Sequence, residues 1–415
     1  MKYKYLLSLL LLFTLIQFNT KAQESIKVMS YNLLNFPLGD MPSREDTLDI
    51  ILKYYQPDLF LIQELKAEFG LNAAMSSLNE LNMDEYQTST FVTQQSGGGG
   101  GLQQAMVYNN RIFGLSHEDI ILTPVRDVNY FKLFLRAANL ADGADTVFVH
   151  VYVTHLKSSS GNANELLRQE SVNSFLPYLN ALEEDDHVIF AGDFNVYSST
   201  EPAYQSLLNS QNSPALLDPI DSPGNWTSSS YPLKEIHTQS TRTSSVFGDG
   251  ATGGVDDRFD FILCSEALMN QSSPLHYIDE TYHAFGNSGL CYNQNSLACA
   301  NTNGLPAAVS SAIYYQSDHF PVVMELTTDL QLGIISQVKA PEFKLFDNHR
   351  GSLSLVNTKV INGLNIFDIS GRLVKQFGSL FQPGTHHLEH GLNPGIYLAV
   401  EATGSNSNAL KLIIQ

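Results

Sequence analysis

Acidic, amide and imidazole side chains follow or adjoin short apolar runs at several widely separated places in the chain. These side chains are Asn32, Glu64, His155, Asp193, Asn195, Asp260, Asp318 and His319. Carboxylate and carboxamide oxygens bind hard divalent cations, and imidazole transfers protons near neutral pH. If the apolar runs are strands of packed sheets, their ends collect at one rim, where these side chains could converge in one site.

The apolar run Val188–Ala191 shows the pattern most clearly. It has the character of a doubly buried strand and stops at Gly192. Asp193 and Asn195 follow, and on extended backbone they share a face while Phe194 points into the core. Because Gly, Asp and Asn also favour turns, a plain turn after the strand is the alternative interpretation.

The patterns around these residues predict alternating helices and strands. The expected helices are 43–55, 66–81 and 164–182, and the expected strands are 26–31, 59–62, 86–93, 105–108, 131–140, 146–154, 188–191, 214–217, 258–263 and 322–326. Because β-α-β order is mixed with hairpin order, we expect an α/β domain. Its two mixed β-sheets should pack face to face with helices outside.

The chain divides into four predicted segments. Residues 1–23 have basic residues, a short apolar core and small residues at the end, which is typical of a secretory signal peptide. An uncleaved membrane anchor is the alternative. Residues 24–328 form the large domain, 329–341 a linker, and 342–415 a small C-terminal all-β sandwich. No later stretch approaches the roughly 20 apolar residues of a membrane span, so we expect no stable membrane span. We also expect the protein to be a monomer.

A long polar insertion, 265–316, follows the strand at 258–263. It could form a rim over the strand ends or a surface excursion. Within it, Cys291 and Cys299 could pair, as in other exported proteins, whereas Cys264 should be buried at the end of its strand.

The formal net charge is −19, from 42 acidic and 23 basic side chains. Such a balance repels polyanions at long range and argues against tight, non-specific binding of duplex through a basic surface. Phosphate chemistry would therefore depend on a local cluster of residues or on divalent cations.

The blocks that carry the polar residues resemble those of the endonuclease/exonuclease/phosphatase superfamily, the DNase I-like proteins. In chain order they are Ser30-Tyr31-Asn32-Leu33, Gln63-Glu64, Thr154-His155-Leu156, Gly192-Asp193-Phe194-Asn195, Arg258-Phe259-Asp260 and Ser317-Asp318-His319. The resemblance covers about residues 26–327. It implies a metal-dependent phosphoesterase on a four-layered α/β sandwich.

The resemblance also implies roles for individual residues. The implied ligands of Mg²⁺, with Mn²⁺ or Ca²⁺ left open, are Asn32, Glu64 and Asp318. The implied catalytic residues are His155, Asp193, Asn195, Asp260 and His319, and the implied phosphate contacts are Arg136, His155 and Asn195. His319 would be the general acid or base, oriented by Asp260, and Asp193 would position or deprotonate the attacking water. Whether Asp193 or His319 takes the proton is left open, and Arg136 could equally form an ordinary surface salt bridge.

Departures from the motifs of particular branches bear on the substrate. The inositol polyphosphate phosphatase branch usually has a Trp before its Gly-Asp and an Arg after the Asn, where this chain has Phe190-Ala191 and Val196-Tyr197-Ser198. A secreted sphingomyelinase would carry an apolar membrane-docking hairpin, but 265–316 is mainly polar. We therefore expect a secreted endonuclease that acts on extracellular nucleic acid, with DNA as the favoured substrate. The alternatives are a phosphoesterase acting on a lipid headgroup or small phosphate ester, and an inactive surface binding protein.

The C-terminal segment resembles the sorting domain of type IX secretion. The motifs are Phe367-Asp368-Ile369-Ser370-Gly371-Arg372, Leu392-Asn393-Pro394-Gly395-Ile396-Tyr397 and Lys411-Leu412-Ile413-Ile414. The resemblance implies the type IX secretion machinery as a partner. The expected location is outside the cell or on its surface.

Overall fold

The computed structural model describes residues 24–332 and 343–414 apart from short internal gaps. The gaps are 40, 42, 83–84, 99, 139, 141–145, 228, 230–232, 246, 348–350, 358–359, 369–371 and 403–409. The chain forms two compact units that divide between residues 333 and 334. The predicted signal peptide and most of the predicted linker lie outside the described residues.

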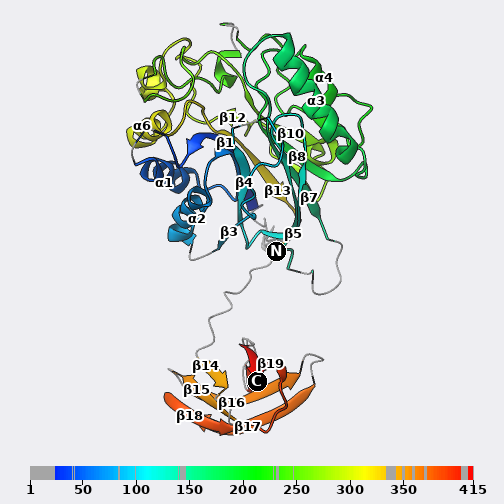
Figure 1. The fold of residues 1–415 in the computed structure, drawn as a ribbon, viewed down its shortest axis with the longest axis vertical. Helices are drawn as coiled ribbons and strands as arrows, with labels where there is room; N and C mark the ends of the chain where they lie inside the picture. The colour runs from blue at the N-terminus through cyan, green and yellow to red at the C-terminus, as the bar shows by residue number, and fades with distance from the viewer. Residues whose placement is uncertain are drawn as a thin grey trace, which may run out of the picture. The chain divides into compact units, whose positions relative to one another are not determined.

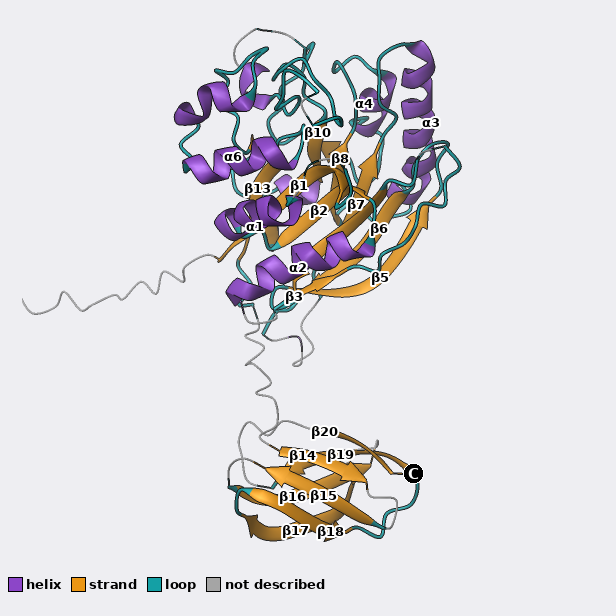
Figure 2. Ribbon diagram, turned by 60° about the vertical axis from the view of Figure 1, so that its left-hand side comes forward, coloured by secondary structure: helices purple, strands orange, loops and turns teal. Residues whose placement is uncertain are grey.

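The first large sheet has the strand order β11-β13-β1-β2-β4-β3, with β12 paired to β13. Its strands are β1 (Glu24–Phe36), β2 (Leu59–Leu65), β3 (Tyr86–Thr88), β4 (Gln103–Asn109), β11 (Leu275–Tyr277), β12 (His283–Ala284) and β13 (Val322–Thr328). The helices α1 (Arg44–Tyr55), α2 (Glu68–Asn82) and α6 (Ala307–Gln316) cover its outer face (Figure 2).

The second large sheet has the order β5-β6-β7-β8-β10-β9. Its strands are β5 (Phe113–Ile121), β6 (Val128–Leu135), β7 (Phe148–His155), β8 (His187–Asp193), β9 (Leu216–Leu217) and β10 (Asp260–Ser265). The helices α3 (Asn162–Leu179) and α4 (Pro202–Leu207) pack on its outer face (Figure 1).

Apolar side chains on the inner faces of the two sheets form one shared core. Val28 of β1 and Leu61 of β2 belong to the same buried cluster as Val151 of β7 and Ile189 of β8. The central strands β2 and β8 are buried on both faces because helices cover the outer sides of the sheets. The predicted α/β architecture of two mixed sheets with helices outside is confirmed.

Several elements differ from the prediction. The strand expected over 86–93 ends at Thr88, and β5 was not predicted at all. The polar insertion contains α5 (Glu266–Met269), β11, β12, a 3₁₀ segment (Ser296–Thr302) and α6. Cys291 and Cys299 form a disulfide, and Cys264 is a buried free thiol.

The second unit is all β in its described part. Its strands are β14 (Phe343–Asp347), β15 (Ser352–Asn357), β16 (Ile361–Asp368), β17 (Leu373–Phe381), β18 (Gly384–Glu389), β19 (Gly395–Glu401) and β20 (Leu410–Ile414). They form the sheets β14-β15-β18 and β17-β16-β19-β20 around a small apolar core. Among the residues described in either unit, no helix is long and apolar enough to span a membrane.

Candidate active site

The polar strand ends lie at one edge of the two packed sheets. β1 and β2 are parallel, as are β7 and β8, so that the carboxyl ends of each pair meet. β10 runs antiparallel to β8, and β13 runs antiparallel to β1, so the starts of β10 and β13 reach the same edge. The side chains placed there are Asn32, Glu64, His155, Asp193, Asn195, Asp260, Asp318 and His319.

Gly192 allows the two central strands of this edge to approach closely. Its φ of 143° lies where side-chain-bearing residues are strained, and a Cβ built there would lie 1.9 Å from the carbonyl oxygen of Thr154. The neighbouring pair of His155 and Asp193 depends on this approach, because the two residues face each other in the β7–β8 register. Glycine before Asp193 is therefore required by packing.

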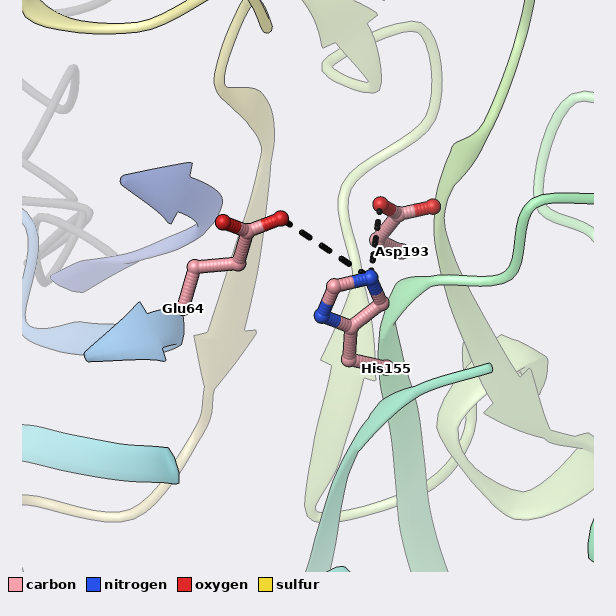
Figure 3. A group of neighbouring side chains, drawn as sticks. All are labelled: Glu64, His155 and Asp193. Atoms are coloured by element: carbon pink, nitrogen blue, oxygen red, sulfur yellow. Dashed lines mark ion pairs between the residues drawn. The ribbon is translucent and has the colours of Figure 1, made fainter. Parts of the chain in front are cut away.

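Asp193 is the hub of the site. Its Oδ2 accepts a hydrogen bond from Asn32 Nδ2 at 3.0 Å, and it lies 3.4 Å from His155 Nε2 and 3.7 Å from His319 Nε2. Figure 3 shows the carboxylates of Asp193 and Glu64 directed at the same ring nitrogen of His155, and Glu64 Oε1 lies 3.9 Å from that Nε2. One carboxylate thus links both histidines and two sheets.

His319 and Asp260 form a buried pair. The imidazole Nδ1 lies 2.7 Å from Asp260 Oδ2. Burial alone would lower the pKa of His319, but the carboxylates of Asp260 and Asp318 outweigh burial and raise that pKa well above its usual value. The pair has the arrangement expected of an oriented acid or base.

Glu64 and Asp318 are held by neutral donors. Glu64 accepts hydrogen bonds from Asn32 Nδ2 and the backbone NH of Asn35, both at 3.1 Å. Asp318 Oδ2 accepts from the backbone NH of Ala251 at 2.6 Å. Burial and the charge of Asp318 raise the pKa of Glu64. The nearby positive charges therefore do not offset the cost of keeping these buried carboxylates ionised side by side.

Two groups of side chains could hold a cation. The ligand atoms of Glu64, His155 and Asp193 lie within 4.8 Å of one another, as do those of Asp193, Asp260 and His319. Burial raises the pKa of Asp193 to about 7; Asp260 and Glu64 add to this rise, and His319 opposes it. A divalent cation fits this oxygen-rich cluster, because it would favour the ionised carboxylates. Asp193 is shared by both groups, although the expected ligands did not include it.

His155 and Asn195 line the same cluster. Burial lowers the pKa of His155 well below its usual value, with Arg126 adding to the effect. Its Nδ1 is buried without a hydrogen-bond partner among the described residues. Asn195 has a positive φ of 52°, and its side chain donates to the carbonyl oxygen of Leu156 at 3.3 Å.

The structure does not bring Arg136, the expected phosphate contact, to the site. Arg136 follows the end of β6, where Phe134 pairs with Phe148 at the start of β7, whereas the site lies at the opposite end of that strand. Its guanidinium donates to Asn110 Oδ1 and to the Phe113 carbonyl oxygen.

Arg126 is the basic residue that the prediction missed. It lies between β5 and β6, and its Nη1 donates to the carbonyl oxygens of His155 and Leu156 at 3.3 and 2.8 Å. Burial lowers the pKa of Arg126, while the charges of Asp193 and Glu64 raise it. Its Nε is buried without a partner among the described residues. No motif in the sequence marks this arginine.

A protein-family model and several solved structures are similar to this chain. Residues 29–319 match the model of the Endonuclease/Exonuclease/phosphatase family. D. rerio TDP2 complexed with single strand DNA product is 15% identical, with a TM-score of 0.46 over 74% of this chain and 100% of that chain. The human nocturnin catalytic domain with bound sulfate is 18% identical, with a TM-score of 0.46 over 73% and 94% of the two chains.

A Bacteroides vulgatus endonuclease/exonuclease/phosphatase is 14% identical, with a TM-score of 0.47 over 74% of this chain and 100% of that chain. No curated protein matches the sequence. The family match covers more than half of the chain and includes the polar strand ends. The chain therefore belongs to the endonuclease/exonuclease/phosphatase family of metal-dependent phosphoric ester hydrolases.

Proposed function

We propose that the protein is a secreted, metal-dependent phosphodiesterase, an endonuclease that hydrolyses extracellular nucleic acid. The observation that carries the proposal is the position of Asp193, within 3.7 Å of both His155 and His319 and hydrogen-bonded to Asn32. Acid and base groups thus surround one buried carboxylate beside further carboxylates. This arrangement suits attack of water on phosphorus.

Mg²⁺ is the proposed cofactor, held by Glu64 and Asp318 with Asn32 beside them, and with Asp193 as a further oxygen donor. The fit rests on the carboxyl groups and on the raised pKa of Glu64, since Mg²⁺ prefers oxygen ligands. Mn²⁺ and Ca²⁺ share this preference. When bound, the ion supplies charge neutralisation on the phosphate oxygens and on the leaving oxygen.

The protein groups divide the remaining work. His319, oriented by Asp260 at 2.7 Å, transfers a proton at its Nε2, and Asp193 orients the attacking water. His155 and Asn195 hydrogen-bond the phosphate. We add Arg126 as a phosphate contact because its buried Nε lacks a partner among the described residues and its charge interacts with Asp193.

Nucleic acid is the proposed substrate because the sequence lacks the motifs of the inositol phosphatase branch. The chain as a whole is strongly acidic, with a net charge of −19. Contacts with a polyanion must therefore be local, through residues such as Arg126 and through the metal. A lipid headgroup or a small phosphate ester is the second substrate class to test.

Export is proposed from the two ends of the sequence. The signal peptide of residues 1–23 directs the chain across the inner membrane, and the C-terminal unit directs it through the type IX secretion machinery. The N-terminal composition and the tail motifs support this proposal.

The test is a substrate panel. The purified protein is incubated with plasmid DNA, RNA, sphingomyelin and a chromogenic phosphodiester, each with Mg²⁺ and with EDTA. We expect cutting of DNA within the strand that EDTA abolishes. Preferential hydrolysis of sphingomyelin would support the lipid alternative, and no Mg²⁺-dependent hydrolysis of any substrate would contradict the proposed activity.

A further inference from the structure

Residues 238–241 form a short strap between the segments that carry Asp260 and His319. Thr238 Oγ1 accepts hydrogen bonds from the backbone NH groups of Phe259 and Asp260 at 3.0 and 3.1 Å. On the other side, Thr241 NH donates to the Asp318 carbonyl oxygen at 2.9 Å. The strap therefore connects the two halves of the buried acid–base pair.

The side chain of Gln239 is the part of the strap that reaches solvent. Thr238, Ser240 and Thr241 are buried, whereas Gln239 is half-buried. Its Nε2 lies 2.6 Å from His319 Nε2 and 3.1 Å from Asp318 Oδ2. Gln239 thus stands between solvent and the ring nitrogen that faces Asp193.

The carboxamide fixes two functional groups at once. Because a carboxylate only accepts hydrogen bonds, the amide nitrogen of Gln239 faces Asp318. The same nitrogen can donate to His319 Nε2 only when that ring nitrogen carries no proton, as is the case when Asp260 holds the proton at Nδ1 of a neutral ring. Asp260 holds the opposite ring nitrogen of His319, so the ring is contacted at both ends. Gln239 Nε2 and the Ala251 NH both donate to Asp318 Oδ2. Asp318 Oδ1 accepts from Ser317 Oγ at 3.5 Å and lies 4.0 Å from His319 Nε2.

The backbone of Gln239, not its side chain, joins it to the segment before β10. Its NH donates to the Asp257 carbonyl oxygen, and its carbonyl oxygen accepts from the NH groups of Asp256 and Asp257. All described hydrogen bonds of the carboxamide go to His319 and Asp318. The backbone of Gln239 therefore holds the strap in place, and its side chain hydrogen-bonds only to residues of the site among those described.

We propose that Gln239 is a positioning residue of the phosphodiesterase reaction, which sets the placement of His319 and of the Asp318 carboxylate. The inference rests on the proposed function for its catalytic part, and on hydrogen-bond geometry for the contact itself.

The test replaces the carboxamide by an apolar group of similar length. Gln239→Met keeps the volume and loses both hydrogen bonds, so we expect kcat to fall roughly ten- to hundredfold with KM changed less than about threefold. The matched control is Gln169→Met. Gln169 is also half-buried and donates to Asn173 and Ser206 on the outer helices. We expect the control to keep its kcat.

A second readout does not depend on activity. In metal-free protein labelled with ¹⁵N-histidine, the His319 signal is identified by its loss in His319→Gln. It should shift in Gln239→Met and in the carboxylate variant Gln239→Glu, and stay in place in Gln169→Met. A preserved kcat in Gln239→Met would overturn the positioning role, whatever the signal does.

The two failures are distinguishable. If neither the unchanged protein nor Gln169→Met hydrolyses any phosphodiester, the proposed function fails, and the His319 signal alone decides the Gln239 contact. An unmoved signal in both Gln239 variants would then overturn the inference, and a shifted signal would support it.

Discussion

Asp193 owes its properties to its neighbours. It is 2% exposed and accepts a hydrogen bond from Asn32. Burial raises its pKa most, His319 lowers that pKa, and the carboxylates of Asp260 and Glu64 raise it further. The sequence predicts that these residue types meet, because each adjoins an apolar run. The distances decide which pairs interact, and they place Asp193 in contact with both histidines.

The arginine proposed to contact the phosphate could not be identified from the sequence. Arg136 and Arg126 flank the same strand, β6, at its two ends. The sequence pattern predicts the strand between the two arginines, but it does not predict which end of that strand lies at the site. Only the β6–β7 register places Arg126 beside His155 and Arg136 at the far edge.

The first prediction concerns the separate replacement of each of these two arginines by methionine. Arg126→Met should raise KM for the phosphodiester by about tenfold, since a charge-assisted hydrogen bond to phosphate is lost. Arg136→Met serves as the control and should leave KM unchanged. Steady-state kinetics with Mg²⁺ checks both, and an equal effect of the two variants would contradict the assignment of Arg126.

At the scale of elements, the central strands were predictable, whereas the edge strand β5 and the helix α6 were not. The apolar runs of β2 and β8 are buried on both faces, so their sequences are unambiguous. β5 is an edge strand that carries Ser116, His117, Glu118 and Asp119, and such a polar stretch reads as a loop. α6 lies within a polar insertion, and its short apolar stripe gave too little signal.

A buried ion pair between Arg258 and Asp218 links the residues just before β10 to those just after β9. Arg258 makes a two-pronged contact with Asp218, at 2.8 and 2.9 Å, just after β9. Arg258→Met should lower the free energy of unfolding of the first unit by about 3–5 kcal/mol, because it leaves a buried charge without its partner. Urea unfolding followed by circular dichroism measures this loss. The exposed pair of Arg111 and Glu85 is the control, and Arg111→Met should cost less than about 1 kcal/mol.

The same pair predicts a pH dependence. Burial raises the pKa of Asp218, but Arg258 outweighs it and holds that pKa below its usual value. The pair therefore stabilises the fold above the usual pKa of an aspartate, and this contribution is lost as pH falls through the lowered value. The stability gap between the unchanged protein and Arg258→Met should narrow on acidification. A gap that stays constant from pH 7 to pH 3 would contradict this account.

At the scale of the whole molecule, the catalytic unit and the C-terminal unit have different roles in the proposal. The polar residues of the site all belong to the first unit, while the tail motifs belong to the second. A tail for secretion needs no contact with the site. Composition and motif order suggested this division, because the tail consists of short strands and turns without a catalytic grouping.

Deletion of residues 339–415 tests the role of the second unit. In a host with type IX secretion, the truncated protein should accumulate in the periplasm and retain its Mg²⁺-dependent activity there. Cell fractionation followed by immunoblotting measures the distribution. Normal appearance of the truncated protein outside the cell would contradict the proposed sorting role.

The central claim is that Asp193 and His319 carry out metal-assisted hydrolysis of a phosphodiester. The most direct measurement is the rate on plasmid DNA and on a chromogenic phosphodiester with Mg²⁺ for Asp193→Ala and His319→Ala. The exposed His283→Ala is the control. Both site variants should lose at least about a hundredfold in kcat, as expected when a general acid or base is removed, and the control should not. Near-native rates in both site variants would contradict the account.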